Sequence, residues 1–322
     1  MRIMTRFIAL PIPAIIVCCA FLTACGGNRM TSVPLYIPSG PVSERILNEA
    51  RIAGNIAFGL YQNGQYQQAL TGYQTALSNL FLIDHEQEIA NIRHNIAHIY
   101  IALAQYDKAQ KETDLALDAN RRFGFAGRIA LNLATSARIS ERKKNPDPDK
   151  ALALYREAIL ILFNNSGSRN DLAVQYNNCG YLLLGQKKYP EAIAEFSQAI
   201  RYAVSENFYA EIAAGYSGIG LANLAIGKPG DALVAFTSAL NADKATENSP
   251  AIAQDLKNMG KACEALNKQE LALEYYDRAL RINMALRRFD RVRTDVEDLI
   301  RIQTALGNTE AVANLKRVLK DL

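Results

Sequence analysis

The pattern of apolar and polar positions along most of this chain has the period of an α-helix, and no convincing alternating strand pattern is present. The stretch Tyr176 to Ile200, YNNCGYLLLGQKKYPEAIAEFSQAI, shows the pattern clearly. With Ala192 as the reference, Gly180 lies twelve residues before it, and Phe196 and Ala199 lie four and seven residues after it. Offsets of four and seven fall on one helix face, and small residues let two helices approach closely. The stretch therefore predicts a hairpin of two packed helices.

The hairpin pattern recurs at intervals of 40 to 42 residues. The reference alanine has counterparts at Ala69, Ala109, Ala151, Ala232 and Ala272. A second alanine follows by seven residues, at Ala76, Ala116, Ala158, Ala199, Ala239 and Ala279. Four residues after the reference come Tyr73, Thr113, Tyr155, Phe196, Phe236 and Tyr276, and twelve before it come Ala57, Ala97, Gly180, Gly220 and Gly260. Because each hairpin can bury its apolar face only against its neighbours, this repetition predicts a stacked array.

Two units depart from the pattern. In the third, an insertion separates Ala134 from Ala151, and the inserted KKNPDPDK is expected to form a proline-rich loop. A seventh, degraded unit fits Leu299, Ala311, Leu315 and Val318 and is expected to cap the array.

Turn-forming residues predict several helix boundaries. Gly185 is expected to end one helix and Pro190 to begin the next. Asp84 with Gln87 resembles a capping box, and Ser249 is expected to cap a helix that begins at Pro250.

The repeats resemble the tetratricopeptide repeat over nearly all of residues 43–322. The small residues and the ring after the reference alanine match its motif, and Tyr176 and Tyr216 stand where the motif usually carries Trp. The period near 40 is longer than the usual 34 residues, as in long-helix variants of the family. The resemblance implies an all-α fold, a solenoid of about seven helix-turn-helix units in a right-handed superhelix with a concave groove. Another two-helix solenoid would have nearly the same architecture.

The N-terminus predicts a lipid-anchored protein of the bacterial envelope. Residues 1–24 carry two arginines and a short apolar run, as in a signal peptide, and end in Leu22-Thr23-Ala24 before Cys25. This resembles the lipobox of bacterial lipoproteins, which implies cleavage before Cys25 and acylation of that residue. Gly26 in place of Asp favours the outer membrane, on its periplasmic face, if the source is Gram-negative. Residues 25–42 are expected to be a flexible tether.

Charge and composition favour neither nucleic acid nor catalysis. The formal net charge is +4, and loss of the arginines of the signal segment would leave about +2, which implies no nucleic-acid partner. His94 and His98 lie four residues apart on one helix face, but no third metal ligand has a suitable spacing, so we expect no metal and no cofactor. Cys179 and Cys263 lie two units apart along the array, and we expect both to be buried and unbridged.

In tetratricopeptide arrays the first helix of each unit lines the concave groove. Residues 18, 15, 11 and 8 before each reference alanine share one helix face. From these positions we expect a partner to contact Phe58, Tyr61, His94, His98, Asn177, Tyr181, Leu184, Lys257 and Lys261. The groove would be aromatic and polar at one end and basic at the other, where the two lysines would meet an acidic group.

The sequence thus predicts a non-enzymatic scaffold, held to the membrane through Cys25, that binds a protein or peptide in the groove. Pilus, secretion and envelope-assembly machinery are the partners that the resemblance implies. Two alternatives stay open: a small-ligand or glycan carrier that uses the groove aromatics, and a metal-dependent enzyme centred on His94 and His98. The sequence does not decide the oligomeric state.

Overall fold

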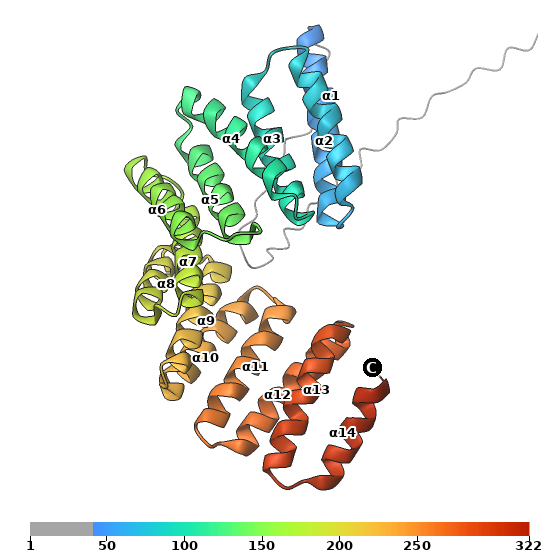
Figure 1. The fold of residues 1–322 in the computed structure, drawn as a ribbon, viewed down its shortest axis with the longest axis vertical. Helices are drawn as coiled ribbons and strands as arrows, with labels where there is room; N and C mark the ends of the chain where they lie inside the picture. Colours follow the sequence, from blue (N-terminus) through green and yellow to red (C-terminus); the bar gives the residue numbers. More distant parts are fainter. Residues whose placement is uncertain (1–40, 322) are drawn as a thin grey trace, which may run out of the picture.

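The computed structural model describes residues 41–321, which form fourteen α-helices and no strand. Consecutive helices pack as hairpins, and the seven hairpins follow one another around a curved array (Figure 1). The all-α solenoid of about seven units is therefore confirmed. The helices are α1 Val42–Gln62, α2 Tyr66–Phe81, α3 Glu86–Ala102, α4 Tyr106–Phe123, α5 Ala126–Arg142, α6 Pro148–Asn164, α7 Arg169–Gly185, α8 Tyr189–Val204, α9 Tyr209–Ala225, α10 Pro229–Ala245, α11 Ser249–Ala265, α12 Gln269–Ala285, α13 Phe289–Ala305 and α14 Thr309–Asp321.

The repeated small and aromatic residues form the core of each hairpin. All six reference alanines and the six alanines seven residues later are fully buried. The residues between them, from Tyr73 in the first unit to Tyr276 in the sixth, are at most 2% exposed. The repetition seen in the sequence is therefore the repetition of one packing contact.

A single residue in the left-handed region reverses the chain in most turns. Twelve of the thirteen connections contain one residue with positive φ, and in eight of them this residue is not glycine. After α7 it is Lys187, with φ 61°, although Gly185 is the last residue of the helix. The expectation that Gly185 ends α7 is right, but the reversal itself takes place two residues later.

The two cap predictions are wrong by one residue. His85, not Asp84, caps α3, because Asp84 has a positive φ of 48° and its role is in the turn. The His85 ring accepts from the backbone N–H of Glu88. Asn248, not Ser249, caps α11 through the N–H of Ala251.

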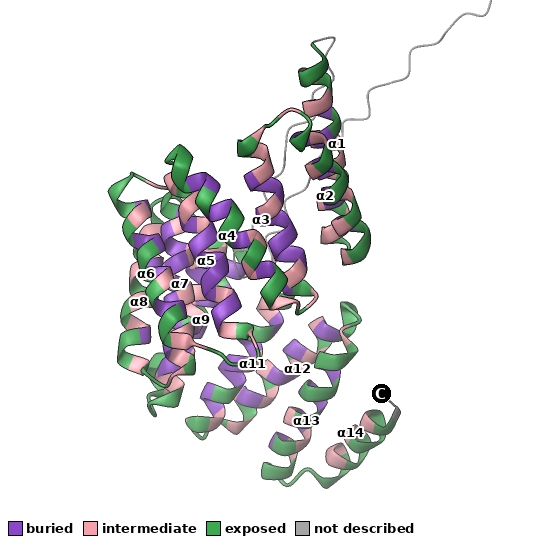
Figure 2. Cartoon of the chain, turned by 45° about the horizontal axis from the view of Figure 1, so that its top comes forward, coloured by how far each residue is buried: buried purple, intermediate pink, exposed green. Residues whose placement is uncertain are grey.

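The odd-numbered helices line the inner side of the array. α3 contacts α5, α7 contacts α9, and α9 contacts α11, past the even-numbered helix that lies between each pair in sequence. Alternate helices come this close only on the inner side of a curved stack. Figure 2 shows α3 and α5 as largely buried and α14 as largely exposed, as expected for a terminal unit.

The insertion in the third unit lengthens one turn and shifts one helix. The connection from α5 to α6 spans residues 143–147, and it is the connection without a left-handed residue. α6 begins at Pro148, so the end of the predicted proline-rich loop is helical. Ala137, two residues further from Ala151 than the pattern predicts, is fully buried.

The predicted signal peptide, the predicted acylation site Cys25 and the predicted tether up to residue 40 lie outside the described residues. α1 begins at Val42, at the end of the predicted tether. Within the described part, no helix is both long and apolar enough to cross a membrane.

Candidate functional site: a polar hollow on the inner face

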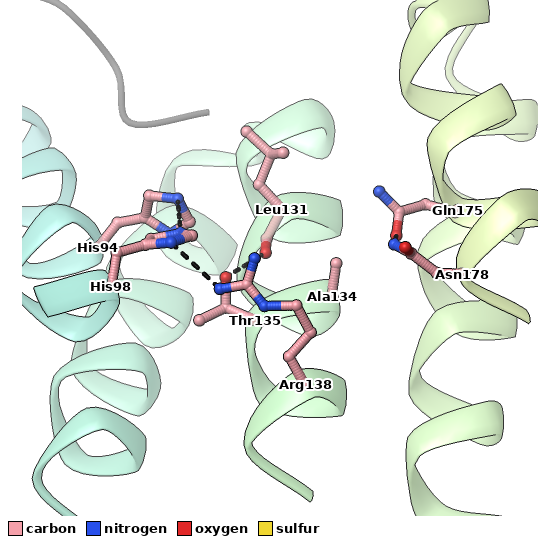
Figure 3. Close-up of a pocket in the computed structure, with 8 residues that line it drawn as sticks. All are labelled: His94, His98, Leu131, Ala134, Thr135, Arg138, Gln175 and Asn178. Atoms are coloured by element: carbon pink, nitrogen blue, oxygen red, sulfur yellow. Dashed lines mark hydrogen bonds between the residues drawn. The ribbon is translucent and has the colours of Figure 1, made fainter. Parts of the chain in front are cut away.

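Two histidines of α3 and an arginine of α5 form a chain of hydrogen bonds on the inner face (Figure 3). An Nη of Arg138 lies 3.1 Å from Nδ1 of His98. Nε2 of His98 lies 3.1 Å from Nε2 of His94. Nδ1 of His94 lies 2.8 Å from Oδ1 of Asn132, which returns the chain to α5.

Arg138 fixes which group donates and which accepts at each step of the hydrogen-bond chain. A guanidinium can only donate, so Nδ1 of His98 accepts and its Nε2 carries the proton. Nε2 of His94 then accepts, and its Nδ1–H donates to Asn132. Both rings are thus neutral, each in one defined tautomer.

The surroundings keep His98 neutral. It is only 3% exposed, and burial is the main cause that lowers its pKa well below the usual value. The positive charge of Arg138 and the neighbouring His94 lower the pKa further. Burial also lowers the pKa of Arg138 itself.

A small hollow opens beside Arg138, between α5 and α7. Its volume is about 20 Å³, enough for one or two water-sized groups. Gln175 and Asn178 reach towards it from α7, across from Arg138 (Figure 3). The Asn178 amide donates to Oε1 of Gln175 at 3.1 Å, so the far wall is an uncharged amide pair.

The structure brings some of the predicted groove residues together. His98 contacts both His94 and Arg138, and Tyr61 of α1 lies near enough to affect the electrostatics of Arg138. Phe58 is half-buried, like Tyr61, whose ring lies 5.6 Å from that of Tyr66.

The predicted residues of α7 divide into a buried one and more accessible ones. Asn177 is buried, and its amide donates to the Glu211 carbonyl of α9, so it joins two units. Leu184 is half-buried. Tyr181 is 40% exposed, and its hydroxyl donates to the Ala214 carbonyl at 2.8 Å. Tyr181 therefore presents a ring held in one position.

At the basic end of the predicted groove, Lys257 is paired with acidic residues of the same chain. Lys257 lies 2.9 Å from both Asp295 and Asp298 of α13. The next unit thus already supplies acidic groups to Lys257, and contact of Lys257 with an acidic group of a partner stays a prediction. Lys261, one turn further along α11, is exposed.

Arg138 and Asn132 are the residues that sequence reasoning missed. Counted from Ala151, the groove positions of the third unit are out of register, because the longer α5–α6 turn displaces that unit by two residues. Arg138 lies 13 residues before Ala151, and removal of those two residues would place it 11 before, in line with His98 and Tyr181. The insertion was visible in the sequence and could have supplied this correction.

The described residues offer neither a metal-ligand cluster nor an activated thiol. Within residues 41–321, His, Cys, Asp and Glu form no group of three or more that could hold a metal ion. Cys179 and Cys263 are free and buried, and burial raises the pKa of Cys179 to about 12. A thiol with so high a pKa is protonated and a poor nucleophile at neutral pH.

Stacked hairpins with a polar inner face define the chain as an α-solenoid. Tetratricopeptide repeat models match residues 90–123 and 211–285, so these parts of the chain carry tetratricopeptide repeats. None of the curated proteins compared with it by sequence matches significantly.

Solved structures share the fold at low sequence identity. A Rap protein complexed with competence and sporulation factor is 17% identical, with a TM-score of 0.60, over 85% of this chain and 75% of that one. Aspartyl phosphate phosphatase F from Bacillus subtilis is 12% identical, with a TM-score of 0.65, over 87% and 71%. PilW, a type IV pilus biogenesis factor, is 20% identical, with a TM-score of 0.54, over 71% and 91%.

Proposed function

We propose that this chain is a non-enzymatic adaptor that holds a segment of a partner protein against its inner face. The observation that carries the proposal is the hollow where α3, α5 and α7 present His98, Arg138 and Asn178 to a common space. A solenoid that only had to fold would gain nothing from charged and amide groups there, because burying them costs free energy.

The comparisons support a role in binding. Tetratricopeptide repeat arrays commonly present extended concave surfaces to partners. One similar structure is a complex with a signalling factor, and another is a pilus biogenesis factor. A third similar structure is a phosphatase. The hollow of this chain pairs its histidines with each other and with Arg138, and offers no activated nucleophile, which favours binding over catalysis.

Binding can be tested by capture of partners from solubilised envelopes with matched variants. Tyr181→Ala removes an exposed ring of the inner face, and Val234→Ala removes an exposed side chain of the even-numbered helix α10. We expect Tyr181→Ala to lose partners that wild type and Val234→Ala retain. Identical partner sets for all three proteins would contradict the use of this face.

We further propose that the adaptor acts at the bacterial envelope, anchored through acylated Cys25 on the periplasmic face of the outer membrane. The small residues before Cys25 and the apolar run before them support this placement. Two or three acyl chains anchor a protein stably, whereas one does not. Cys25→Ser should move the protein from the membrane to the soluble fraction, and a variant that stays in the membrane fraction would refute the anchor.

A further inference from the structure

Unlike Arg51, Arg93 and Lys257, Arg138 has no acidic partner among the described residues. Arg51 and Glu88 lie 3.1 Å apart, Arg93 and Glu112 lie 2.7 Å apart, and Lys257 has two aspartates. Among the described residues, no carboxylate lies within 4.0 Å of the Arg138 guanidinium. Its Nε is fully enclosed and lacks a hydrogen-bond partner, and its hydrogen bond to His98 goes to a neutral ring.

The Arg138 guanidinium is thus an enclosed positive charge without a counter-charge. A charge taken out of water without a counter-charge costs free energy, and an opposite charge in the same place recovers it. The guanidinium offers donors in a planar fork that fits a carboxylate in a bidentate manner. One guanidinium balances one negative charge, and the facing wall of Gln175 and Asn178 adds only uncharged amides.

We propose that Arg138 and His98 form a proton-coupled carboxylate-binding site, which takes one carboxylate of the segment held on the inner face. This inference rests on the proposed adaptor function. An acidic side chain and a chain end can both supply this carboxylate, since both present the same two oxygens to the fork.

The coupling to a proton follows from the hydrogen-bond chain. When the Arg138 fork turns to a carboxylate, Nδ1 of His98 loses its donor and the charge of Arg138 is neutralised. The part of the influence on His98 that comes from the charge of Arg138 is thereby removed, although burial and the neighbouring His94 persist. The pKa of His98 then rises on binding, the site takes up protons, and binding strengthens as the pH falls.

Few titratable or charged groups surround the hydrogen-bond chain formed by Arg138, His98 and His94. His98 is faced by His94 on its own helix and by Arg138 of α5. Arg138 is influenced by Glu141 and Arg142 on α5, Tyr155 of α6 and Tyr61 of α1. Glu141 accepts the Tyr155 hydroxyl at 2.6 Å, so it is already engaged. α7 contributes only the amides of Gln175 and Asn178 to the hollow.

The chain has three histidines, so their ring resonances can be followed individually. The full chain, labelled with ¹⁵N-histidine, would be titrated with pH alone and with four probes. These are sodium acetate, the end-blocked peptide acetyl-Ala-Glu-Ala-amide, acetyl-Ala-Ala-Ala with a free C-terminal carboxylate, and the amide of that last peptide. His85 caps α3 away from the hollow and is the internal reference.

We expect the carboxylate probes to raise the titration midpoint of His98, with binding tighter at lower pH, and the amide to have no effect. Preference for the glutamate peptide identifies a side-chain carboxylate as the ligand, and preference for the free C-terminus identifies a chain end. Equal effects of both peptides and acetate identify a site for any carboxylate. If no carboxylate probe moves His98 relative to His85, the proposal is overturned.

Variants of α5 locate the site. Arg138→Gln should weaken carboxylate binding by about tenfold or more, because it removes the charge and the paired donors of the fork. Arg138→Lys keeps the charge without the fork and should bind more weakly than wild type. Arg142→Gln removes an exposed arginine one turn away, which affects Arg138 only through its charge, and should change binding far less than Arg138→Gln. Unchanged binding by folded Arg138→Gln, with folding checked by circular dichroism, would also overturn the proposal.

The test of the adaptor function and the test of the carboxylate site can fail independently of each other. Partner capture that depends on Tyr181 while no carboxylate probe affects His98 would leave the adaptor standing and remove the carboxylate site. Carboxylate binding at Arg138 without any Tyr181-dependent partner would remove the adaptor.

Discussion

At the scale of single residues, aromatic rings dictate glycine in the later units. A Cβ built on Gly180 would lie 2.6 Å from the Phe196 ring, and one on Gly220 would lie 2.4 Å from Phe236. Both rings are fully buried and have no space into which to move. Glycine is therefore required here by close approach of two helices, and not by its backbone freedom.

Gly180→Ala should consequently lower the free energy of unfolding by about 1–3 kcal/mol through overpacking. Urea denaturation followed by circular dichroism measures the change. Gly185→Ala is the matched control, because no atom lies within 4 Å of the added Cβ. The control should be neutral or stabilise by up to about 1 kcal/mol, and equal losses in both variants would show that the ring contact is not the cause.

At the scale of elements, the same two repeat positions form a contact between units at two neighbouring places in the array, but with different pairs of residues. Between α12 and α13, the Asn283 amide donates to the buried Asp295 carboxylate at 2.6 Å. Forty residues earlier, between α10 and α11, the equivalent pair is Asp243 and Asp255, both at most 3% exposed. Two buried carboxyls in hydrogen-bond contact must share a proton, and burial with the charge of Asp243 raises the pKa of Asp255 to about 8.

The Asp243–Asp255 pair predicts a stability that falls as the pH rises. The folded-state pKa is raised, so its contribution is fully present below the unfolded pKa near 4 and is lost as the pH approaches 8. The slope would be on the order of 1 kcal/mol per pH unit. Asp243→Asn, which copies the Asn283–Asp295 pair, should flatten this slope and stabilise the protein at pH 8 in urea titrations. A slope unchanged by the substitution would rule out the shared proton.

At the scale of the whole molecule, each unit is stabilised mainly by its neighbours, so protection from unfolding should fall towards the open end of the array. Most residues of α14 are exposed, whereas α3 and α5 are mostly buried. In hydrogen–deuterium exchange read out by mass spectrometry, we expect the amides of α14 to exchange first and those of α3 and α5 last. Uniform protection along the array would instead indicate a single cooperative unit.

The residues of the groove could be predicted only in part from the sequence. Counting from the reference alanines found Tyr61, His94, His98 and Tyr181, because these positions repeat with the units. It did not find Arg138, since the longer α5–α6 turn shifts the register, nor did it show that Lys257 is already paired with Asp295 and Asp298. Which charges pair across units depends on how far each unit is rotated against the next, and local spacing does not contain that rotation.

The sequence by itself determined the number of hairpins, their packing residues and the inner position of the first helix of each unit. These follow from short-range spacing, which the helix period converts directly into a buried face. Only the tertiary structure decided which polar residues are paired and which are not. The curvature that brings α3, α5 and α7 around one hollow leaves Arg138 with a neutral histidine and without an acid, and that contact between units gives this repeat protein its candidate binding site.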